Sequence, residues 1–273
     1  MKLDETTSFP ILEAKNKRSI KAKVVIGCDG SNSVVANFLQ LNPTKALGPR
    51  VVRGFTSYPS GHGFPPEFSR IKIGNIVCGR IPVTDKLVVW LTSLHHNSQD
   101  SKISKDKEAI ARFALESIDE FPEDWKEMVK NCDLSFIYMS NLRYRPPWEI
   151  LFGKFRRNTV TVTGDAMHLM GPYIGQGACS ALEDAVVLGR CLGKKLGQDR
   201  GLDEVCRIRD IEESIDEYVR ERRKRLVALS TQTYLTGLFV ESSSGFMKMM
   251  LLLLLTILFY DQIRHTSFDC GLL

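Results

Sequence analysis

The chain has 273 residues, a net charge of +5 and 43% apolar residues. This length allows one large domain or two smaller ones, and the apolar content excludes an intrinsically disordered chain. The seven cysteines form no C-x-x-C pair, so we expect neither a disulfide framework nor a metal site. The charge is mild and no nucleic-acid-binding motif occurs, so nucleic acid is not an expected partner.

The N-terminal stretch MKLDETTSFPILEAK lacks the apolar segment of a signal peptide and is not rich in Arg and Ser. We therefore expect neither a signal peptide nor a transit peptide. A cytoplasmic, reducing location also fits the unpaired cysteines.

The first predicted strand is KVVIGC, residues 23–28, a short run rich in β-branched residues. Charged residues precede it and DGSNS follows it, a pattern typical of a buried parallel strand that ends in a turn. Residues 34–41 then have the pattern of a short helix, with Asn32 or Ser33 available as its N-cap.

The middle of the chain has a different pattern. Residues 50–94 alternate partially between apolar and polar positions, with Gly, Pro and Asn between the runs, which predicts several antiparallel strands. Residues 105–131 are predicted to form two helices, the second beginning at Pro122. Residues 134–139 are predicted as a strand and residues 141–149 as a loop.

The clearest strand signal is TVTVT, residues 159–163, five β-branched residues in a row. A helix is predicted after the following loop, beginning near Gly177 and ending near Gly193. Glu183 and Asp184 are expected off its apolar face. That face is predicted to consist of Ala178, Ala181, Leu182, Ala185, Leu188 and Leu192.

Beyond residue 200 the sequence predicts a long helix, because apolar side chains recur at every third or fourth position. The stripe has one gap, at Arg222. RERRKR, residues 220–225, is interpreted as the solvated side of this helix, with attraction to an anionic membrane or partner surface as the alternative. The stripe consists of Ile208, Ile211, Ile215, Tyr218, Val219, Leu226 and Leu229.

The run MMLLLLLTILFY, residues 249–260, has no charge over 12 residues. A membrane-spanning helix needs about 20 apolar residues, so we interpret the run as a helix buried on most of its sides. An interfacial or spanning helix is the alternative. A peripheral membrane contact through residues 246–260 is one hypothesis of this kind.

The order of these elements predicts the architecture. A strand and helix come first, antiparallel strands with helices follow, and a second strand and helix come after them. This order favours an α/β domain that carries an inserted α+β domain.

Two of the predicted strands end in loops that combine an acid with a glycine, Asp29–Gly30 and Gly164–Asp165. Open α/β sheets bind ligands at the carboxyl ends of their strands. A short acid such as Asp165 accepts hydrogen bonds from sugar hydroxyls, and Pro172 stiffens a loop that could lie against a flat ring. The loops could therefore hold one extended cofactor.

The start of the later helix, Gly175-Gln176-Gly177, adds backbone N–H groups that have no partner within the helix. Such groups stabilise negative charge on a ligand. A purely structural interpretation stays open, in which DG is only a turn and GQG only a tight helix entry.

The segments around these two loops resemble the motifs of a known protein family. VVIGCDGSNSVV resembles the second fingerprint of the FAD-dependent class A aromatic-hydroxylase monooxygenases, and GDAMHLMGPYIGQGACSALEDA resembles their third. RYRPPWE and the terminal FDCG resemble the plant branch that is similar to salicylate hydroxylase and zeaxanthin epoxidase. The resemblance covers nearly the whole chain. It implies an α/β fold with a partial, Rossmann-like FAD-binding domain of the glutathione-reductase type, an inserted α+β substrate domain and C-terminal helices.

The resemblance also implies an activity. FAD would be the cofactor and NAD(P)H the co-substrate that reduces it. One atom of O₂ would then hydroxylate or epoxidise a small apolar or aromatic substrate. The flavin supplies this chemistry, while the protein supplies position, electric field and exclusion of water.

Roles for individual residues follow from the same resemblance. Asp29 and Gly30 would lie near the FAD pyrophosphate and the path of the nicotinamide nucleotide. Gly164 and Asp165 would hold the ribityl chain. No catalytic acid or base is assigned, and His168 is interpreted as a hydrogen-bonded structural residue. The residues implied to border the isoalloxazine ring are Pro172, Gly175, Gln176, Gly177 and Ala178.

The family's first fingerprint, a strand followed by G-x-G-x-x-G and a helix, does not occur in the 273 residues. Neither GHGFPP at Gly61 nor GQGACS at Gly175 matches it. This fingerprint holds the ADP half of FAD, so we expect an N-terminally truncated member of the family with weak or no FAD binding. A non-catalytic remnant or regulatory fragment of the family is the alternative function.

The predicted domain boundaries follow these motifs. Residues 1–43 would be a partial FAD-binding domain without its first βαβ unit, and residues 44–150 the substrate domain with its antiparallel sheet. Residues 151–200 would complete the FAD-binding domain, and residues 201–273 would form C-terminal helices. The sequence predicts neither the substrate, nor a preference for NADH or NADPH, nor the oligomeric state.

Overall fold

A computed structural model describes residues 1–4, 7, 9–14, 16–94, 106–197, 204–261 and 266–272. The chain forms two compact units, and the second is an insertion into the first. Unit 1 comprises Met1–Lys45 and Arg143–Leu273, and unit 2 comprises Ala46–Leu142. The boundary expected at residues 200–201 lies outside the described residues, and the domain roles given above stay predictions.

The sheet of unit 1 joins segments that are far apart in the sequence, in the order β10-β11-β4. β4 (Val25–Gly27) and β11 (Val160–Val162) are parallel neighbours, so both predicted strands are present. β10 (Arg156–Arg157) pairs antiparallel with β11. All of β11 is buried, as expected for a strand covered on both faces. A separate antiparallel sheet consists of β1 (Lys2–Leu3), β2 (Pro10–Glu13) and β3 (Ser19–Lys21).

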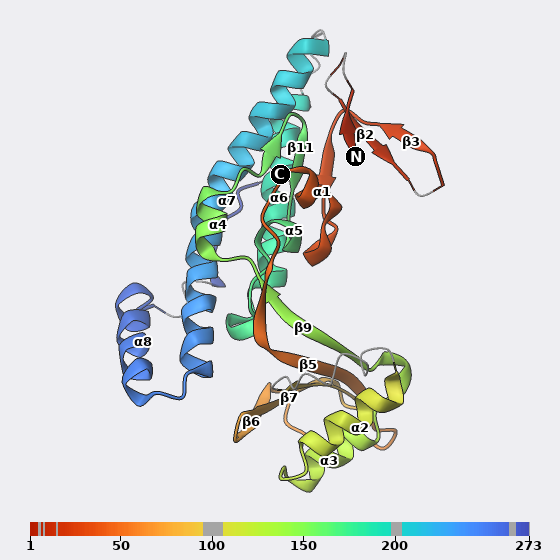
Figure 1. Cartoon of the computed structure of the whole chain (residues 1–273), viewed down its shortest axis with the longest axis vertical. Coiled ribbons are helices and arrows are strands. Elements are labelled where there is room, and N and C mark those ends of the chain that lie inside the picture. The colour runs from red at the N-terminus through yellow and green to blue at the C-terminus, as the bar shows by residue number, and fades with distance from the viewer. Residues whose placement is uncertain are drawn as a thin grey trace. The chain divides into compact units, whose positions relative to one another are not determined.

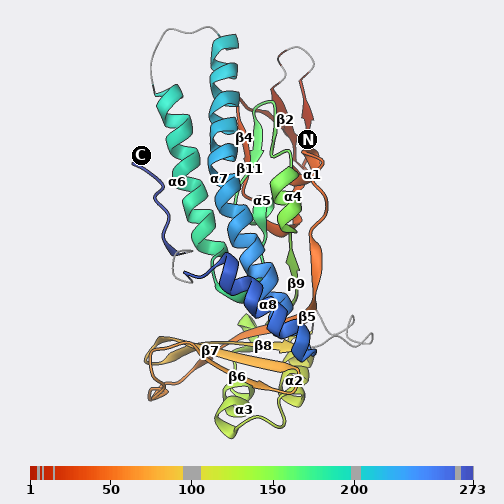
Figure 2. The same ribbon diagram turned by 90° about the vertical axis from the view of Figure 1, so that its left-hand side faces the viewer.

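Two long helices, α6 (Gly177–Leu196) and α7 (Glu204–Glu241), lie side by side in unit 1 (Figures 1 and 2). The apolar stripe predicted on α7 is buried from Ile211 to Leu229, while Ile208 is half-buried. Shorter helices complete the unit, and their apolar side chains join the same core. These helices are α1 (Val34–Phe38), α4 (Pro147–Phe152) and α5 (Asp165–His168).

The buried face of α6 differs from the predicted one. Leu188 is buried as expected, but Leu182 is 71% exposed and Ala178 and Ala185 are exposed as well. The predicted face was wrong because polar side chains of α6 point inward, where partners from other elements receive them. The buried residues are Ser180, Asp184, Val187, Leu188 and Cys191.

The leucine-rich run forms α8 (Gly245–Leu258), which contacts α7. The prediction that this helix is buried on most sides was wrong. Among its described residues only Leu251 is buried, Leu255 is half-buried, and the other large apolar side chains are exposed. In the described part of the chain, no helix combines the length and the apolar character that crossing a membrane requires.

Unit 2 contains an antiparallel sheet in the order β6-β7-β8-β5-β9, as the alternating pattern predicts. Two helices, α2 (Lys107–Ser117) and α3 (Glu123–Lys130), belong to the same core. Trp90 Nε1 donates to Thr56 Oγ1 (3.0 Å), which donates to the Met128 carbonyl (2.6 Å), so these buried polar atoms are satisfied. The strands are β5 (Lys45–Ser57), β6 (Ser69–Ile73), β7 (Ile76–Thr84), β8 (Leu87–Leu94) and β9 (Tyr138–Tyr144).

Residues 134–149 depart from the predicted strand and loop. Leu134–Phe136 forms a 3₁₀ turn, because the Asp133 carboxylate accepts the Ser135 N–H (2.8 Å). β9 follows and extends into the stretch predicted as a loop. α4 then begins at Pro147, a residue type favoured in the first turn of a helix.

We predict that Gly54→Ala destabilises unit 2. A Cβ on Gly54 would lie 2.4 Å from the Trp90 ring, which is 1% exposed and has no room to move. The expected loss is about 1–3 kcal/mol in the free energy of unfolding, measured by urea denaturation. Gly48→Ala on the same strand is the control, because a Cβ there meets nothing within 4 Å. Equal effects of the two substitutions would contradict the prediction.

Candidate functional site

The two acid-bearing loops begin at the same edge of the sheet of unit 1. β4 and β11 run parallel, with Gly27 paired to Val162, and the Thr163 N–H continues the ladder to the Gly27 carbonyl (3.0 Å). The 3₁₀ turn η1 (Gly30–Asn32) then contacts α5, which begins at Asp165. Parallel pairing therefore brings the loop of Asp29–Gly30 against the loop of Gly164–Asp165.

The Asp29 carboxylate caps the start of α1. It accepts hydrogen bonds from Ser33 Oγ (2.5 Å) and from the Val34 N–H (2.7 Å), while Ser33 Oγ accepts from the Ala36 N–H (2.8 Å). Burial raises the pKa of Asp29, but the hydrogen bonds from Ser33 and Val34 outweigh it and leave the pKa below its usual range. The adjacent Gly30 has φ +74°, and a Cβ there would meet nothing within 4 Å, so its backbone is open to a ligand.

Asp165 is an exposed residue within a buried segment. Every other residue from Thr159 to His168 is buried. Gly164 reverses the chain at the end of β11 with φ +58° and ψ −141°, a conformation that favours glycine. The fold thus presents one carboxylate to solvent from a tightly held turn.

The third predicted loop precedes α6. It contains the 3₁₀ turn η4 (Pro172–Ile174), and Thr233 Oγ1 of α7 donates to the Gly171 carbonyl (2.9 Å). Gly175 has φ +65° and open space where a Cβ would lie. In the described structure Gln176 makes no side-chain capping bond at the start of α6, so the first N–H groups of this 20-residue helix remain available. Pro172, Gly175 and Ala178 are exposed, and Gln176 and Gly177 are half-exposed.

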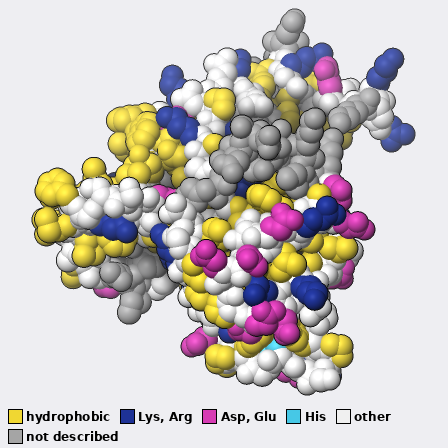
Figure 3. Space-filling view, turned by 60° about the horizontal axis from the view of Figure 1, so that its bottom comes forward, with side chains coloured by type: hydrophobic (Ala, Val, Ile, Leu, Met, Phe, Trp, Pro, Cys, Tyr) yellow, Lys and Arg dark blue, Asp and Glu magenta, His cyan; other side chains and the backbone are white. Residues whose placement is uncertain are grey.

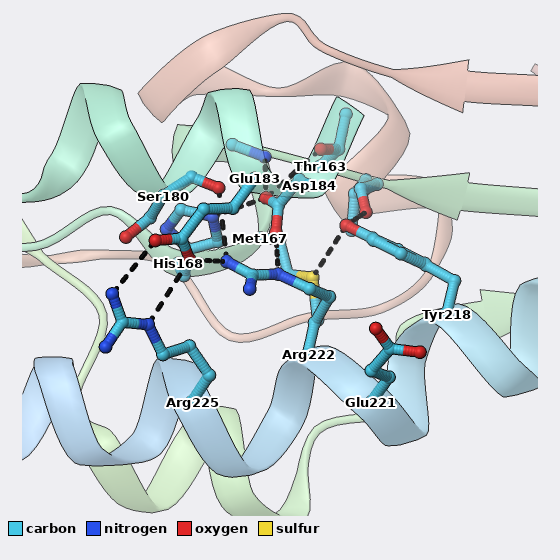
Figure 4. A network of polar contacts seen from close by, with 12 residues as sticks. Thr163, Met167, His168, Ser180, Glu183, Asp184, Tyr218, Glu221, Arg222 and Arg225 are labelled. Carbon is cyan, nitrogen blue, oxygen red and sulfur yellow. Dashed lines mark hydrogen bonds and ion pairs between the residues drawn. The ribbon is translucent and has the colours of Figure 1, made fainter. Parts of the chain in front are cut away.

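A buried polar network lies directly behind the Gly164–Asp165 loop (Figure 4). Its centre is Asp184, which is completely buried. One carboxylate oxygen, Oδ2, accepts the Gly164 N–H (2.9 Å), Thr163 Oγ1 (3.2 Å) and His168 Nε2 (2.6 Å). The hydrogen bond expected of His168 is therefore present, and its structural role stays a prediction.

Arg222 of α7 supplies the opposite charge. Its Nε donates to Asp184 Oδ1 (2.7 Å) and its Nη2 to Glu183 Oε2 (2.7 Å), and the side chain is fully buried. Burial raises the pKa of Asp184, but His168 and Arg222 outweigh it, so the pKa lies below its usual value and the carboxylate is ionised at neutral pH. Asp184 and Arg222 therefore form a buried ion pair between α6 and α7.

The basic run at residues 220–225 is thus not only a solvated face, and that interpretation was wrong for three of its arginines. Arg222 is buried, Arg223 donates to backbone carbonyls of α4 and of the residue after it, and Arg225 pairs with Glu183 (2.9 Å). The ring of Phe268 covers the guanidinium groups of Arg222 and Arg225, at 4.7 and 5.2 Å from its centroid.

Sequence reasoning placed Asp184 off the inner face of α6 and did not assign Arg222 to the site. One signal pointed to Arg222, because it interrupts an otherwise apolar stripe. A long polar side chain in such a position needs a buried partner.

A small cavity of about 190 Å³ lies beside η1 within unit 1. Arg143 and Arg145 line it, and none of its described lining residues is acidic. Arg145 is 3% exposed, and its Nε has no partner in the described part of the chain. Arg143 thus favours an anion in this cavity, while the charge of Arg145 is partly offset by the Glu149 carboxylate (3.6 Å). The sequence predicted no role for either arginine. The other lining residues are Gly30, Ser31, Asn32, Ser33, Ala36, Asn37, Leu41, Asn42, Pro43, Thr44 and Ala166.

Comparison with known proteins supports the resemblance seen in the fingerprints. Residues 94–233 match a family described as "FAD binding domain". The chain is 56% identical over 270 residues to "Monooxygenase 1" of Arabidopsis thaliana, covering 98% of this chain and 68% of that protein. It is 37% identical over 258 residues to "Monooxygenase 2" of the same plant, covering 92% of this chain and 63% of that protein.

Solved structures share the fold. The chain matches Klebsiella pneumoniae HpxO, crystallised with FAD and uric acid, with a TM-score of 0.74 at 17% identity, covering 98% of this chain and 66% of HpxO. It matches a salicylate hydroxylase substrate complex with a TM-score of 0.67 at 19% identity, covering 98% of this chain and 67% of that one. The chain spans about two thirds of the length of these proteins. On the fingerprints, the matched domain and the identity to its relatives, the chain belongs to the FAD-dependent monooxygenases of the class A aromatic-hydroxylase type.

Proposed function

We propose that this chain acts as a FAD-dependent monooxygenase that uses NAD(P)H and O₂ to hydroxylate or epoxidise a small apolar or aromatic substrate. The observation that carries the proposal is the meeting of the two acid-bearing loops, after β4 and β11, at one edge of a parallel sheet. Family membership supports the reaction class. The uric acid bound to HpxO supports a small ring compound as the substrate.

The exposed groups of the site fit the flavin half of FAD. The Asp165 carboxylate would accept hydrogen bonds from ribityl hydroxyls, and Gly164 would keep the backbone close to that chain. Asp29 and Gly30 would lie near the pyrophosphate. When bound, FAD supplies the redox chemistry with O₂.

The loop before α6 fits a flat ring that carries negative charge. The open space at Gly175 leaves room for the ring, and Pro172 holds the loop in shape. The uncapped N–H groups of Gly177 and Ala178, together with the α6 dipole, would stabilise an anionic ring edge. Gln176 at the N-cap position would border the same edge.

We predict that Asp165→Ala weakens FAD binding about tenfold or more, because it removes hydrogen bonds to a charged acceptor. The measurement is quenching of flavin fluorescence when the chain is titrated into FAD. We expect the chain itself to bind weakly, since its 273 residues lack a G-x-G-x-x-G unit. Asp85→Ala, at an exposed turn of unit 2, is the control. Absence of saturable binding by the unmodified chain, or equal affinities of the two variants, would contradict the proposal.

The cavity beside η1 supports the use of a nicotinamide nucleotide. Its two guanidinium groups and its polar lining suit a phosphate group, and the cavity adjoins Gly30. Arg143 is held in place, since it donates to Thr44 Oγ1 (2.8 Å) and to the Thr44 carbonyl (2.7 Å). We therefore propose that Arg143 and Arg145 contact the phosphates of NAD(P)H.

Arg143→Ala should weaken NADPH binding about tenfold, because a charge-assisted hydrogen bond to phosphate is lost. Calorimetric titration with NADPH and, separately, with inorganic pyrophosphate measures this loss. Arg70→Ala, an exposed arginine on β6, makes the same change in net charge away from the cavity. If the two variants lose equal affinity, only the overall charge matters and the proposed contact is wrong.

We also propose that this protein is cytoplasmic and that it contacts membranes peripherally through residues 246–260. α8 exposes a continuous apolar surface, with Phe246 69%, Met249 60% and Ile257 66% exposed. The space-filling view shows hydrophobic side chains gathered on the side of the molecule where α8 lies (Figure 3). The strength of binding to a lipid interface grows with the apolar area that the helix buries there, and the exposed side chains of α8 offer such an area.

Phe246→Glu combined with Ile257→Glu should abolish sedimentation of the chain with vesicles that contain phosphatidylserine, because two charges then enter the lipid-facing surface. Leu182→Glu places a charge on an equally exposed apolar residue of α6, 71% exposed, and should leave sedimentation unchanged. Failure of the unmodified chain to sediment with these vesicles at physiological salt would overturn the proposed contact.

A further inference from the structure

The Asp184 carboxylate is bonded to both ends of the short segment that carries Asp165. Its Oδ2 accepts the N–H of Gly164, immediately before Asp165 (2.9 Å), and the ring nitrogen of His168 at the end of α5 (2.6 Å). Gly164 in turn accepts the Met167 and His168 N–H groups at its carbonyl (both 2.9 Å). One buried oxygen therefore determines the conformation of the whole turn.

Arg222 makes this arrangement stable, because the carboxylate would otherwise be an unpaired buried charge. Its guanidinium group donates hydrogen bonds to the carboxylates of Asp184 (2.7 Å) and Glu183 (2.7 Å) and to the Ser180 carbonyl (3.3 Å). The Glu183 carboxylate is held from its other side by Arg225 (2.9 Å). Figure 4 shows these side chains converging from α6 and α7 on the back of the loop.

The polar composition of the network is not explained by stability. An apolar pair of similar volume often stabilises a fold as well as a buried ion pair does. The network also leaves three buried atoms without a partner among the described residues, namely His168 Nδ1, Arg222 Nη1 and Ser180 Oγ. These unpaired buried atoms lower the stability of the fold, so the orientation that the network enforces on its neighbours explains it better than stability does.

We infer that Asp184 and Arg222 are positioning residues for the flavin, which hold the Gly164–Asp165 turn in the one conformation that can receive a ribityl chain. The inference rests on the proposed function, because that proposal names FAD as the ligand. Both side chains are completely buried, so neither would touch the ligand. Both act through the backbone of Gly164 and the ring of His168.

The first test measures amide hydrogen exchange in the chain without ligand. In Asp184→Asn the peptide covering residues 163–168 should exchange about tenfold faster, because the bond from the Gly164 N–H to a charged acceptor is weakened. Peptides from the parts of α7 away from Arg222 should show unchanged exchange rates. Asp216→Asn is the matched control, since Asp216 also pairs with an arginine (Arg156, 2.6 Å) but at an exposed site on α7. Unchanged exchange at residues 163–168 in Asp184→Asn would overturn the inference.

A second variant separates position from stability. Asp184→Leu combined with Arg222→Met replaces the ion pair by an apolar pair and should fold even where Asp184→Asn does not. Its FAD affinity, measured by the same fluorescence titration, should stay at least about tenfold below that of the unmodified chain. Recovery of affinity together with thermal stability would show a merely structural role. If the unmodified chain binds no FAD, the proposed function fails for this chain, while the exchange comparison still decides the inference about the turn.

Discussion

The buried charge of Asp184 is the constraint on which the rest of unit 1 depends. A carboxylate without access to water must find every hydrogen bond inside the protein. Asp184 finds them in the loop after β11, in α5 and in α7. Meeting that requirement sets how α6 approaches α7 and which conformation the loop adopts. The shape of the ligand-facing turn is therefore a consequence of electrostatics in the core behind it.

The second constraint is the parallel pairing of β4 with β11, which brings together two loops that unit 2 separates in the sequence. A different set of hydrogen bonds holds each loop in place. Asp29 and Ser33 cap α1 after the first strand, and Asp184 anchors the turn after the second. The groups left exposed, such as Asp165 and the backbone at Gly30 and Gly175, are thus displayed on rigid supports, which reduces the entropy lost when a ligand binds.

Much of this fold could be predicted from the sequence because its signals are local. The β-branched runs at residues 23–28 and 159–163 predict the strands, and Asn32 or Ser33 predicts the start of α1. The inner face of α6 could not be predicted, because the groups that satisfy buried Asp184 belong to other elements, among them Arg222, 38 residues further along the chain. The periodicity of apolar residues along a helix predicts that a carboxylate lies in solvent and that an apolar run lies in the core. For the same reason it misplaced both Asp184 and α8, in which Leu251 is buried but most of the other leucines are exposed.

The aromatic ring of Phe268 has a practical consequence. It covers two arginines of the network, and the backbone nearby is held by Arg190, whose Nε donates to the Cys270 carbonyl (3.0 Å). The segment that carries Phe268 therefore keeps water away from the ion pair and maintains the low dielectric in which its attraction is strong. Loss of this ring would let water reach the two guanidinium groups and would weaken their attraction to the carboxylates of the network.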